Sequence, residues 1–261
     1  MASTTAVLIL AAGTIFGMMF LVWIGSLFRK DASIIDPFWG LGFVVLAWLY
    51  FFVSEADTAR RPLVVGLVTL WGLRLSVYLW WRNRGRGEDY RYREMRDSHP
   101  GSFALRSLFT VFLLQAAILW LVSLPLYQAL RADRPERLTL LDGLGLLMFA
   151  AGLFFEATGD RQLSRFRSDP ANRGTVLDRG LWRYTRHPNY FGDALVWWGF
   201  FLIALPTPRS AWTLVSPVLM TFLLMKVSGV ALLEKKLGET KAEYRDYVRR
   251  TSAFFPWPPA R

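Results

Sequence analysis

Residues 5–28 read TAVLILAAGTIFGMMFLVWIGSLF, a run of 24 residues without one charged side chain. The hydrocarbon core of a bilayer is about 30 Å thick, and an α-helix of about 20 apolar residues crosses it. The run differs from a secretory signal peptide, because no positively charged region precedes it and it exceeds the usual length of the apolar region in such peptides. We interpret residues 5–28 as the first membrane-spanning helix.

Six more apolar blocks follow, each with at most two charged residues. They cover residues 32–54, 62–81, 107–130, 138–156, 190–206 and 210–233, and Pro125 predicts a kink in the fourth span. The chain is 53% hydrophobic and holds 12 Trp and 20 Phe, more than a soluble core of this size accommodates. These features predict an all-α integral membrane protein with about seven transmembrane helices, joined in part by cytoplasmic loops.

The net charge of +11 distributes unevenly over the loops between these blocks. Of the 31 Lys and Arg residues, 22 lie in the loops after the first, third and fifth spans and in the C-terminal tail. The positive-inside rule therefore predicts an N-terminus outside and a C-terminus in the cytoplasm, and seven spans require the same inversion. The basic charge is thus explained mostly by topology, and no nucleic-acid partner is expected. Residues 233–250 are charged, with apolar positions at helical spacing, which predicts an interfacial C-terminal helix.

Two loops on the predicted cytoplasmic side, residues 82–103 and 157–189, hold 13 Arg and no Lys. The planar guanidinium group suits bidentate contacts with phosphate, so we expect a phosphate-bearing ligand there. Binding of anionic lipid headgroups is the alternative. The chain has no Cys and only two His, which excludes a Cys-ligated metal centre, and no metal site is expected.

Several polar residues lie within the apolar blocks, where ionisable groups are costly and mark candidate sites. Asp36 either caps the start of the second span or is a functional residue. Arg74 and Tyr78 share one face of the third span. The remaining members are Gln115, Glu156, Asp160 and Asp193. Each could form an interhelical hydrogen bond. Together they predict a polar cavity that opens to the cytoplasm.

Residues 180–193, GLWRYTRHPNYFGD, form the most specific motif of the chain. They resemble the C-terminal domain of the steroid 5α-reductase superfamily, most closely its bacterial branch. Further matches follow the chain, at residues 36–40, 82–92, Gln115, 160–163, Arg167 and 251–256. The resemblance implies one polytopic domain over residues 1–261, with a variable N-terminal half (1–135) and a reductase-like core (136–261). It also implies a bacterial inner membrane and NADPH-dependent reduction of a C=C bond in a lipophilic, enone-like substrate, with membrane lipids as the other partners.

The resemblance also assigns roles residue by residue. The cofactor contacts that it implies are Asn83, Arg84, Arg86, Asp160, Arg167, Tyr184, Arg186, His187, Asn189 and Asp193. The catalytic acid of the family lands near Asp36. Its catalytic tyrosine aligns near Trp71, which leaves Tyr78 as the candidate tyrosine and makes Trp71 and Gln115 candidate substrate contacts.

Two other functions remain open from the sequence. Membrane methyltransferases that use S-adenosylmethionine have a similar Arg-His-Pro-x-Tyr before a helix, here residues 186–190, followed later by a Glu pair. This chain has Glu234 and Lys235 instead, and its Arg-rich loops suit a phosphate that S-adenosylmethionine lacks. The third possibility is a non-catalytic lipid-binding membrane protein, which would leave the two polar loops unexplained.

Overall fold

The computed structural model describes residues 3–227 and 244–260. Within these ranges the chain is helical and contains no strand. Five helical segments are long and apolar enough to cross a membrane, which fits a multi-pass membrane protein. They are Thr4–Arg29, Ala32–Phe52, Arg60–Asn83, Phe103–Val122 and Leu140–Ser168.

The last two of the seven predicted spans are not among these five helices. Helix α9 covers Pro188–Ala204, and the apolar segment Ala211–Val227 contains helix α10 (Val215–Phe222). Each has 17 residues, and the end of the seventh predicted span lies outside the described residues. The count of seven and the orientation therefore stay predictions.

The chain divides into two compact units. Unit 1 comprises residues 1–138 and 207–213, and unit 2 comprises residues 139–206 and 214–261. Helix α8 opens unit 2 with a capping box, in which Thr139 N–H donates to Asp142 Oδ2 at 2.7 Å. Because this cap satisfies the free N–H groups of the helix start, it gives α8 a sharp beginning at the unit boundary.

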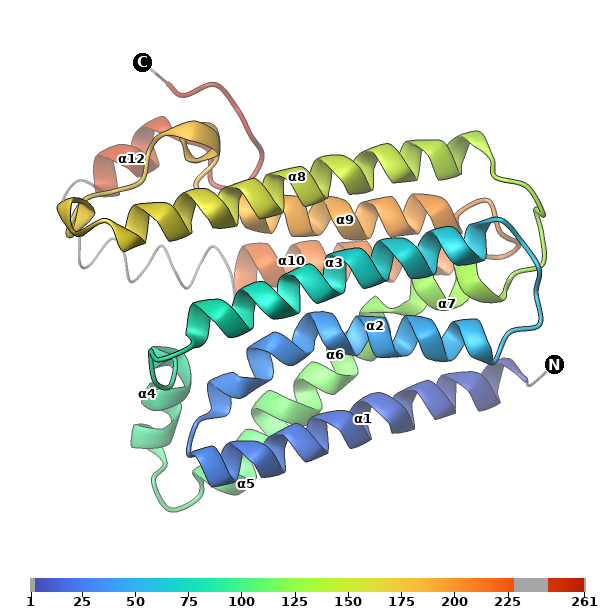
Figure 1. Ribbon diagram of the computed structural model, residues 1–261, viewed down its shortest axis with the longest axis horizontal. Helices are drawn as coiled ribbons and strands as arrows, with labels where there is room; N and C mark the ends of the chain where they lie inside the picture. Colours follow the sequence, from blue (N-terminus) through green and yellow to red (C-terminus); the bar gives the residue numbers. More distant parts are fainter. Residues whose placement is uncertain (1–2, 228–243, 261) are drawn as a thin grey trace. The chain divides into compact units, whose positions relative to one another are not determined.

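Unit 1 contains helices α1 to α7. Their bounds are α1 Thr4–Arg29, α2 Asp36–Phe52, α3 Arg60–Asn83, α4 Tyr90–Ser98, α5 Phe103–Ser107, α6 Leu114–Val122 and α7 Leu124–Arg131. Helices α2 and α3 run antiparallel and side by side (Figure 1), and they touch backbone to backbone at Gly40 and Gly72. A Cβ atom on Gly40 would lie 2.4 Å from the carbonyl oxygen of Gly72, so this position requires glycine. Helices α6 and α7 are separated at Ser123, two residues before Pro125, where the sequence predicts a kink.

Unit 2 is built on the antiparallel pair α8 (Leu140–Ser168) and α9, which lie side by side in Figure 1. Gly145, Gly152 and Gly159 recur every seven residues along α8, and Gly192 and Gly199 do so along α9. Gly145 meets Gly199 and Gly152 meets Gly192, with an added Cβ falling 2.5–2.8 Å from the opposing carbonyl oxygen. The heptad of glycines thus sets both the register and the close spacing of this pair.

The two Arg-rich loops contain more helix than the sequence analysis expected. Helix α8 continues to Ser168, well past Glu156, and α4 forms inside the first loop. Charged and amide side chains do not end a helix, since Arg, Gln and Glu are good helix formers. The actual end of α8 is set by Asp169-Pro170, because proline disfavours helical backbone in the residue before it.

The C-terminal helix is described only in part. Helix α12 covers Tyr244–Arg250, and the other residues of the expected interfacial helix, 233–243, lie outside the described residues. So do Glu234 and Lys235, on which the comparison with methyltransferases turned.

Candidate functional site

A group of polar side chains in unit 1 surrounds the carboxylate at the start of α2. The Asp36 cluster is defined by Asp36, Arg82, Asn83, Arg91, Tyr92 and Gln115. Asp36 opens α2 with Pro37 behind it, which is a favoured place for proline because its missing N–H is not needed there. The end of α3, the start of α4 and the start of α6 supply the other members.

The carboxylate of Asp36 is a common acceptor within this cluster. Tyr92 Oη donates to Asp36 Oδ1 at 3.2 Å, and Asn83 Nδ2 donates to Oδ2 at 3.4 Å. Arg82 and Arg91 each bring a guanidinium nitrogen to 3.7 Å from Oδ2. These contacts satisfy the charge of Asp36 and hold its carboxylate in one orientation. Asp36 therefore links three elements of unit 1 and does more than cap α2.

Tyr92 is the most buried member of the Asp36 cluster, with 6% of its surface exposed. Its phenol hydrogen-bonds both Asp36 and the Gln115 side chain. Burial raises the pKa of Tyr92 far above its ordinary value, the nearby Asp36 charge raises it further, and Arg91 opposes this only in part. Tyr92 therefore keeps its proton at neutral pH and can act as a hydrogen-bond donor.

The loop before α4 is fastened to the segment before α2 by Glu88 and Asp89. Glu88 Oε1 accepts from Ala32 N–H at 2.7 Å, and Arg96 forms a fork on both carboxylate oxygens. Burial of Glu88 opposes its ionisation, but the hydrogen bonds from Arg96 and Ala32 prevail and lower its pKa. Asp89 N–H donates to Ser33 Oγ at 3.3 Å. This fastening fixes α4 and thereby places Tyr92 beside Asp36.

Tyr78, the second candidate catalytic residue, lies next to the Asp36 cluster on α3. The guanidinium carbons of Arg74 and Arg82 each lie 6.0 Å from the centre of its ring. Since Arg82 also faces Asp36, the two candidate catalytic residues share one arginine neighbour. Trp71, a candidate substrate contact, is instead fully buried against Phe43, with ring centres 5.7 Å apart.

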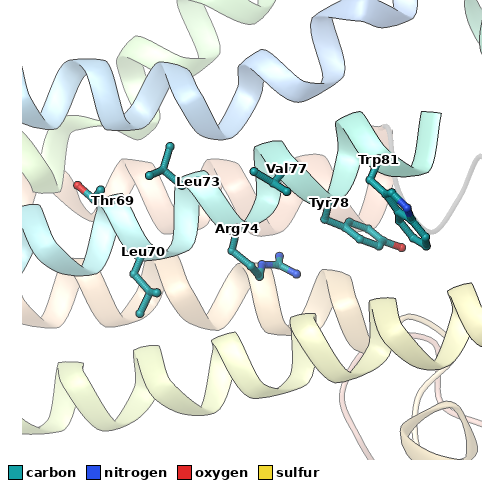
Figure 2. Close-up of a pocket in the computed structure, with 7 residues that line it drawn as sticks. All are labelled: Thr69, Leu70, Leu73, Arg74, Val77, Tyr78 and Trp81. Atoms are coloured by element: carbon teal, nitrogen blue, oxygen red, sulfur yellow. The ribbon is translucent and has the colours of Figure 1, made fainter. Parts of the chain in front are cut away.

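A groove of about 610 Å³ runs along the surface of α3. Figure 2 shows its lining residues, which are Thr69, Leu70, Leu73, Arg74, Val77, Tyr78 and Trp81. The head group of Arg74 extends toward the Tyr78 ring in this view. The groove is therefore mostly apolar, with Arg74 and Tyr78 as polar lining residues, the kind of concave surface that holds an amphipathic molecule.

Unit 2 holds a second polar group around Asn189, at the start of α9. The Asn189 group is defined by Gly159, Asp160, Trp182 and Asn189. Asn189 Nδ2 donates to Asp160 Oδ1 at 3.2 Å, and Trp182 Nε1 donates to the carbonyl oxygen of Gly159 at 3.2 Å. Gly159 permits this approach, because a Cβ there would lie 3.1 Å from the backbone nitrogen of Asn189. The other amide atom, Asn189 Oδ1, is buried and accepts no hydrogen bond from any described residue.

The motif at residues 180–190 is held by the C-terminal segment of unit 2. Arg186 donates its backbone N–H to Ser252 at 2.9 Å, and its guanidinium to the carbonyl oxygens of Val248, at 3.0 Å, and Thr251. Thr185 Oγ1 donates to the Phe254 carbonyl at 2.9 Å. Arg186, a candidate cofactor contact, thus has a structural function in binding the end of α12.

The other candidate cofactor residues are distributed over both units. Arg84 and Arg86 are exposed in unit 1, in a turn that Gly85 and Gly87 permit through φ values of +76° and +70°. Tyr184 and Arg167 are exposed in unit 2, the latter near the end of α8. His187 stacks on Tyr190, with ring centres 5.6 Å apart, and Asp193 is buried on α9. The roles of these residues stay predictions.

Sequence reasoning missed Tyr92 and Arg91 as members of the site. The signal was present, because Tyr92 ends the stretch 82–92 that carries part of the resemblance. What the sequence could not reveal is that α4 turns Tyr92 back onto Asp36, 56 positions earlier.

Comparison with known proteins gives two matches over most of the chain and one local match. A family model described as "Protein of unknown function (DUF1295)" matches residues 22–251. An uncharacterised protein of Schizosaccharomyces pombe is 27% identical over 90% of this chain and 75% of its own length. Steroid 5-alpha-reductase DET2 of Arabidopsis thaliana is 39% identical over 59 residues, which is 22% of each chain. No solved structure matches.

Proposed function

This chain belongs to the DUF1295 family, and from that premise we propose that it is a membrane-embedded, NADPH-dependent reductase of a C=C bond in a lipophilic, enone-like substrate. The observation that carries the proposal is the Asp36 cluster, where a carboxylate and a buried phenol meet at the end of a membrane helix. The local similarity to a steroid 5-alpha-reductase supports the same reaction class.

The residues present suit a dinucleotide with phosphate groups. Exposed guanidinium groups on Arg84 and Arg86 can bind phosphate oxygens as bidentate donors. The buried Oδ1 atom of Asn189 offers an acceptor to an N–H donor such as a carboxamide. Its orientation is set by the other amide atom, since only Nδ2 can donate to the Asp160 carboxylate. NADPH would supply the hydride when bound.

Within this proposal the Asp36–Tyr92 pair delivers the proton. The proton lies between Tyr92 Oη and Asp36 Oδ1, which are 3.2 Å apart, and Arg82 and Arg91 hold the carboxylate in place. The Tyr92 hydroxyl would turn its O–H from Asp36 toward the carbonyl oxygen of an enone as negative charge develops there, and the proton would pass from Tyr92 to that oxygen. Tyr78, whose ring lies 6.0 Å from the guanidinium carbon of Arg82, is a second phenol beside the Asp36 cluster.

The test of the cofactor is a binding titration on the full-length protein in detergent, with NADPH, NADH and S-adenosylmethionine. We expect NADPH to bind at least about tenfold more tightly than NADH, because arginine contacts to the 2′-phosphate add affinity. Equal affinity for the two dinucleotides would refute the proposal, and so would binding of S-adenosylmethionine alone.

Site variants make this test local. Asn189→Ala and Arg167→Ala are each expected to weaken NADPH binding, while Arg165→Ala, an equally exposed arginine of α8, leaves it unchanged. Asp36→Asn should lower the rate of enone reduction more than NADPH affinity. Unchanged titration curves for Asn189→Ala and Arg167→Ala would remove the assigned cofactor contacts.

The proposal includes a topology of seven spans in a bacterial inner membrane, with the N-terminus outside. Reporter fusions test it directly, since alkaline phosphatase is active only outside the cytoplasm. Fusions at Asp57 and Asp133 should be active, and fusions at Asp31 and Arg173 should be inactive. The reverse pattern would overturn the orientation.

A further inference from the structure

Gln115 is the only amide or charged side chain among residues 108–122. The resemblance makes it a candidate substrate contact, but in the structure its side chain hydrogen-bonds the phenol of Tyr92. A polar side chain within an apolar span is costly unless it has a partner, and interhelical hydrogen bonds supply such partners. Since Tyr92 belongs to α4, outside the span, this hydrogen bond joins α6 to the Asp36 cluster.

An irregular turn lies directly before Gln115. Residues Leu108–Leu113 form a π-helix between α5 and α6, and the N–H of Leu114 donates to the carbonyl oxygen of Phe109, five residues earlier. A π-helical turn holds an additional residue, which rotates the side chains that follow by about 100° around the helix axis. The contact of Gln115 with Tyr92 therefore depends on this turn, and such turns occur frequently at functional sites.

The directions of the hydrogen bonds at the Tyr92 oxygen follow from the number of protons available. Tyr92 Oη uses its single proton in the hydrogen bond to Asp36 Oδ1, at 3.2 Å. The phenol oxygen can therefore only accept from its other partner, so the amide of Gln115 donates an N–H group to it. Tyr92 is thus held by an acceptor, Asp36, and by a donor, Gln115.

We propose that Gln115 is a positioning residue for Tyr92, which stabilises the negative charge that forms on the Tyr92 oxygen when its proton passes to the substrate. This role rests on the proposed function, in which hydride from NADPH reduces the C=C bond of an enone. In the proton transfer the O–H bond of Tyr92 breaks and an O–H bond forms on the carbonyl oxygen of the substrate. The resulting enol becomes the saturated ketone, and water returns a proton to the phenolate.

The hydrogen bond from Gln115 strengthens during this step, because a bond to a charged oxygen is about twice as strong as a bond to a neutral one. An interaction that is stronger in the transition state than in the ground state raises kcat and has little effect on substrate binding. Gln115 should therefore act on kcat and through Tyr92, whereas a direct substrate contact would act on its own.

The experiment is a double-mutant cycle of Gln115→Leu and Tyr92→Phe in the full-length protein in detergent, with NADPH oxidation by dec-3-en-2-one as the rate assay. Gln115→Leu should lower kcat about tenfold and leave KM within about twofold of the wild type. In the Tyr92→Phe background the same change should alter kcat by less than about twofold. A tenfold loss that persists without the Tyr92 hydroxyl, or a rise in KM alone, would overturn the proposal.

Two further variants distinguish hydrogen bonding from packing. Gln115→Glu keeps the shape of the side chain, but an ionised carboxylate has no proton to donate, so its kcat relative to the wild type should fall from about pH 5 to about pH 8. A constant ratio would contradict a donor role for Gln115. The matched control is Gln128→Leu on α7, where the amide donates to the carbonyl oxygen of Pro208 at 2.8 Å, and it should keep the wild-type kcat.

Thermal unfolding of the same four proteins separates this inference from the proposed function. The effects of Gln115→Leu and Tyr92→Phe on the unfolding midpoint should not add, because both changes remove one hydrogen bond. Additive effects in a protein that still reduces the enone would refute the contact and leave the reductase in place. Coupled midpoints in a protein that reduces no enone would refute the proposed function, and with it the role of Gln115 in proton transfer.

Discussion

The substitution Gly152→Ala tests the close pairing of α8 and α9. A Cβ atom on residue 152 would lie 2.6 Å from the carbonyl oxygen of Gly192 and 2.7 Å from the backbone nitrogen of Val196. Both neighbours are backbone atoms of α9, so no side-chain rotation relieves the clash. The two helices must separate by several tenths of an ångström, and the contacts on either side of Gly152 loosen with them.

The magnitude follows from comparison with Gly143→Ala on the same helix, where an added Cβ meets no atom within 4 Å. Both substitutions gain the same helix propensity, about 1 kcal/mol, so this gain cancels in the difference. What remains is the cost of overpacking, about 1–3 kcal/mol. Gly143→Ala should therefore be as stable as the wild type or more so, and Gly152→Ala less stable than Gly143→Ala by that amount.

Thermal unfolding in detergent measures this difference. The chain has no Cys, so thiol-reactive dyes do not report its unfolding, but 12 Trp give an intrinsic fluorescence signal. We expect the midpoint for Gly152→Ala to lie several degrees below that for Gly143→Ala. Equal midpoints would show that α8 and α9 do not approach as closely as their glycines indicate.

Three further predictions concern the polar groups. The wild type should be more stable than Glu88→Gln at neutral pH, and this advantage should shrink as the pH falls below about 5 in a thermal unfolding series, because Arg96 and Ala32 lower the pKa of Glu88 and acid protonates it. Tyr92→Phe should be less stable than the wild type by about 1–3 kcal/mol, because it lacks the hydrogen bond from Tyr92 to the Asp36 carboxylate, and its NADPH affinity should not change. An unfolding midpoint equal to that of the wild type would contradict this hydrogen bond. In Arg186→Met, trypsin should cleave the C-terminal segment at least several-fold faster than in the wild type. Equal cleavage rates would argue against a stabilising role for the Arg186 hydrogen bonds to Val248 and Thr251.

The five long apolar helices were largely predictable, because a bilayer requires a minimum length of apolar run and this requirement leaves a block pattern in the sequence. Helix ends were less predictable. The apolar block in α8 ends near Glu156, but the helix continues to Ser168. Its backbone hydrogen bonds do not depend on whether the side chains are polar or apolar. The seven-residue repeat of glycines in α8 and α9 was visible in the sequence, and it encodes a contact that hydropathy does not detect.

The residue types of the candidate site could be predicted, but their pairings could not. Asp36 and Gln115 were singled out because polar groups are rare in apolar spans, yet nothing in their spacing indicates a shared partner. That partner, Tyr92, is brought to them by the contacts of Glu88 and Asp89 with the segment before α2. Such pairings depend on how a loop folds back, and loops carry no hydropathy period.

The motif at residues 180–190 contains residues that hold the fold together and a candidate cofactor contact. Thr185 and Arg186 hold the C-terminal segment, and these contacts would persist in a relative with another activity. Asn189 differs, because its Nδ2 atom is bound to Asp160 while its buried Oδ1 atom has an acceptor site that no described residue uses. Since a buried acceptor is costly when it is not satisfied, the fold retains Asn189 at the expense of stability unless a ligand donates to it. Under the proposed function, Asn189 is therefore a better candidate for a cofactor contact than Arg186 of the same motif. Two variants separate these roles. Asn189→Ala should lose cofactor affinity, and Arg186→Met should lose the attachment of the C-terminal segment.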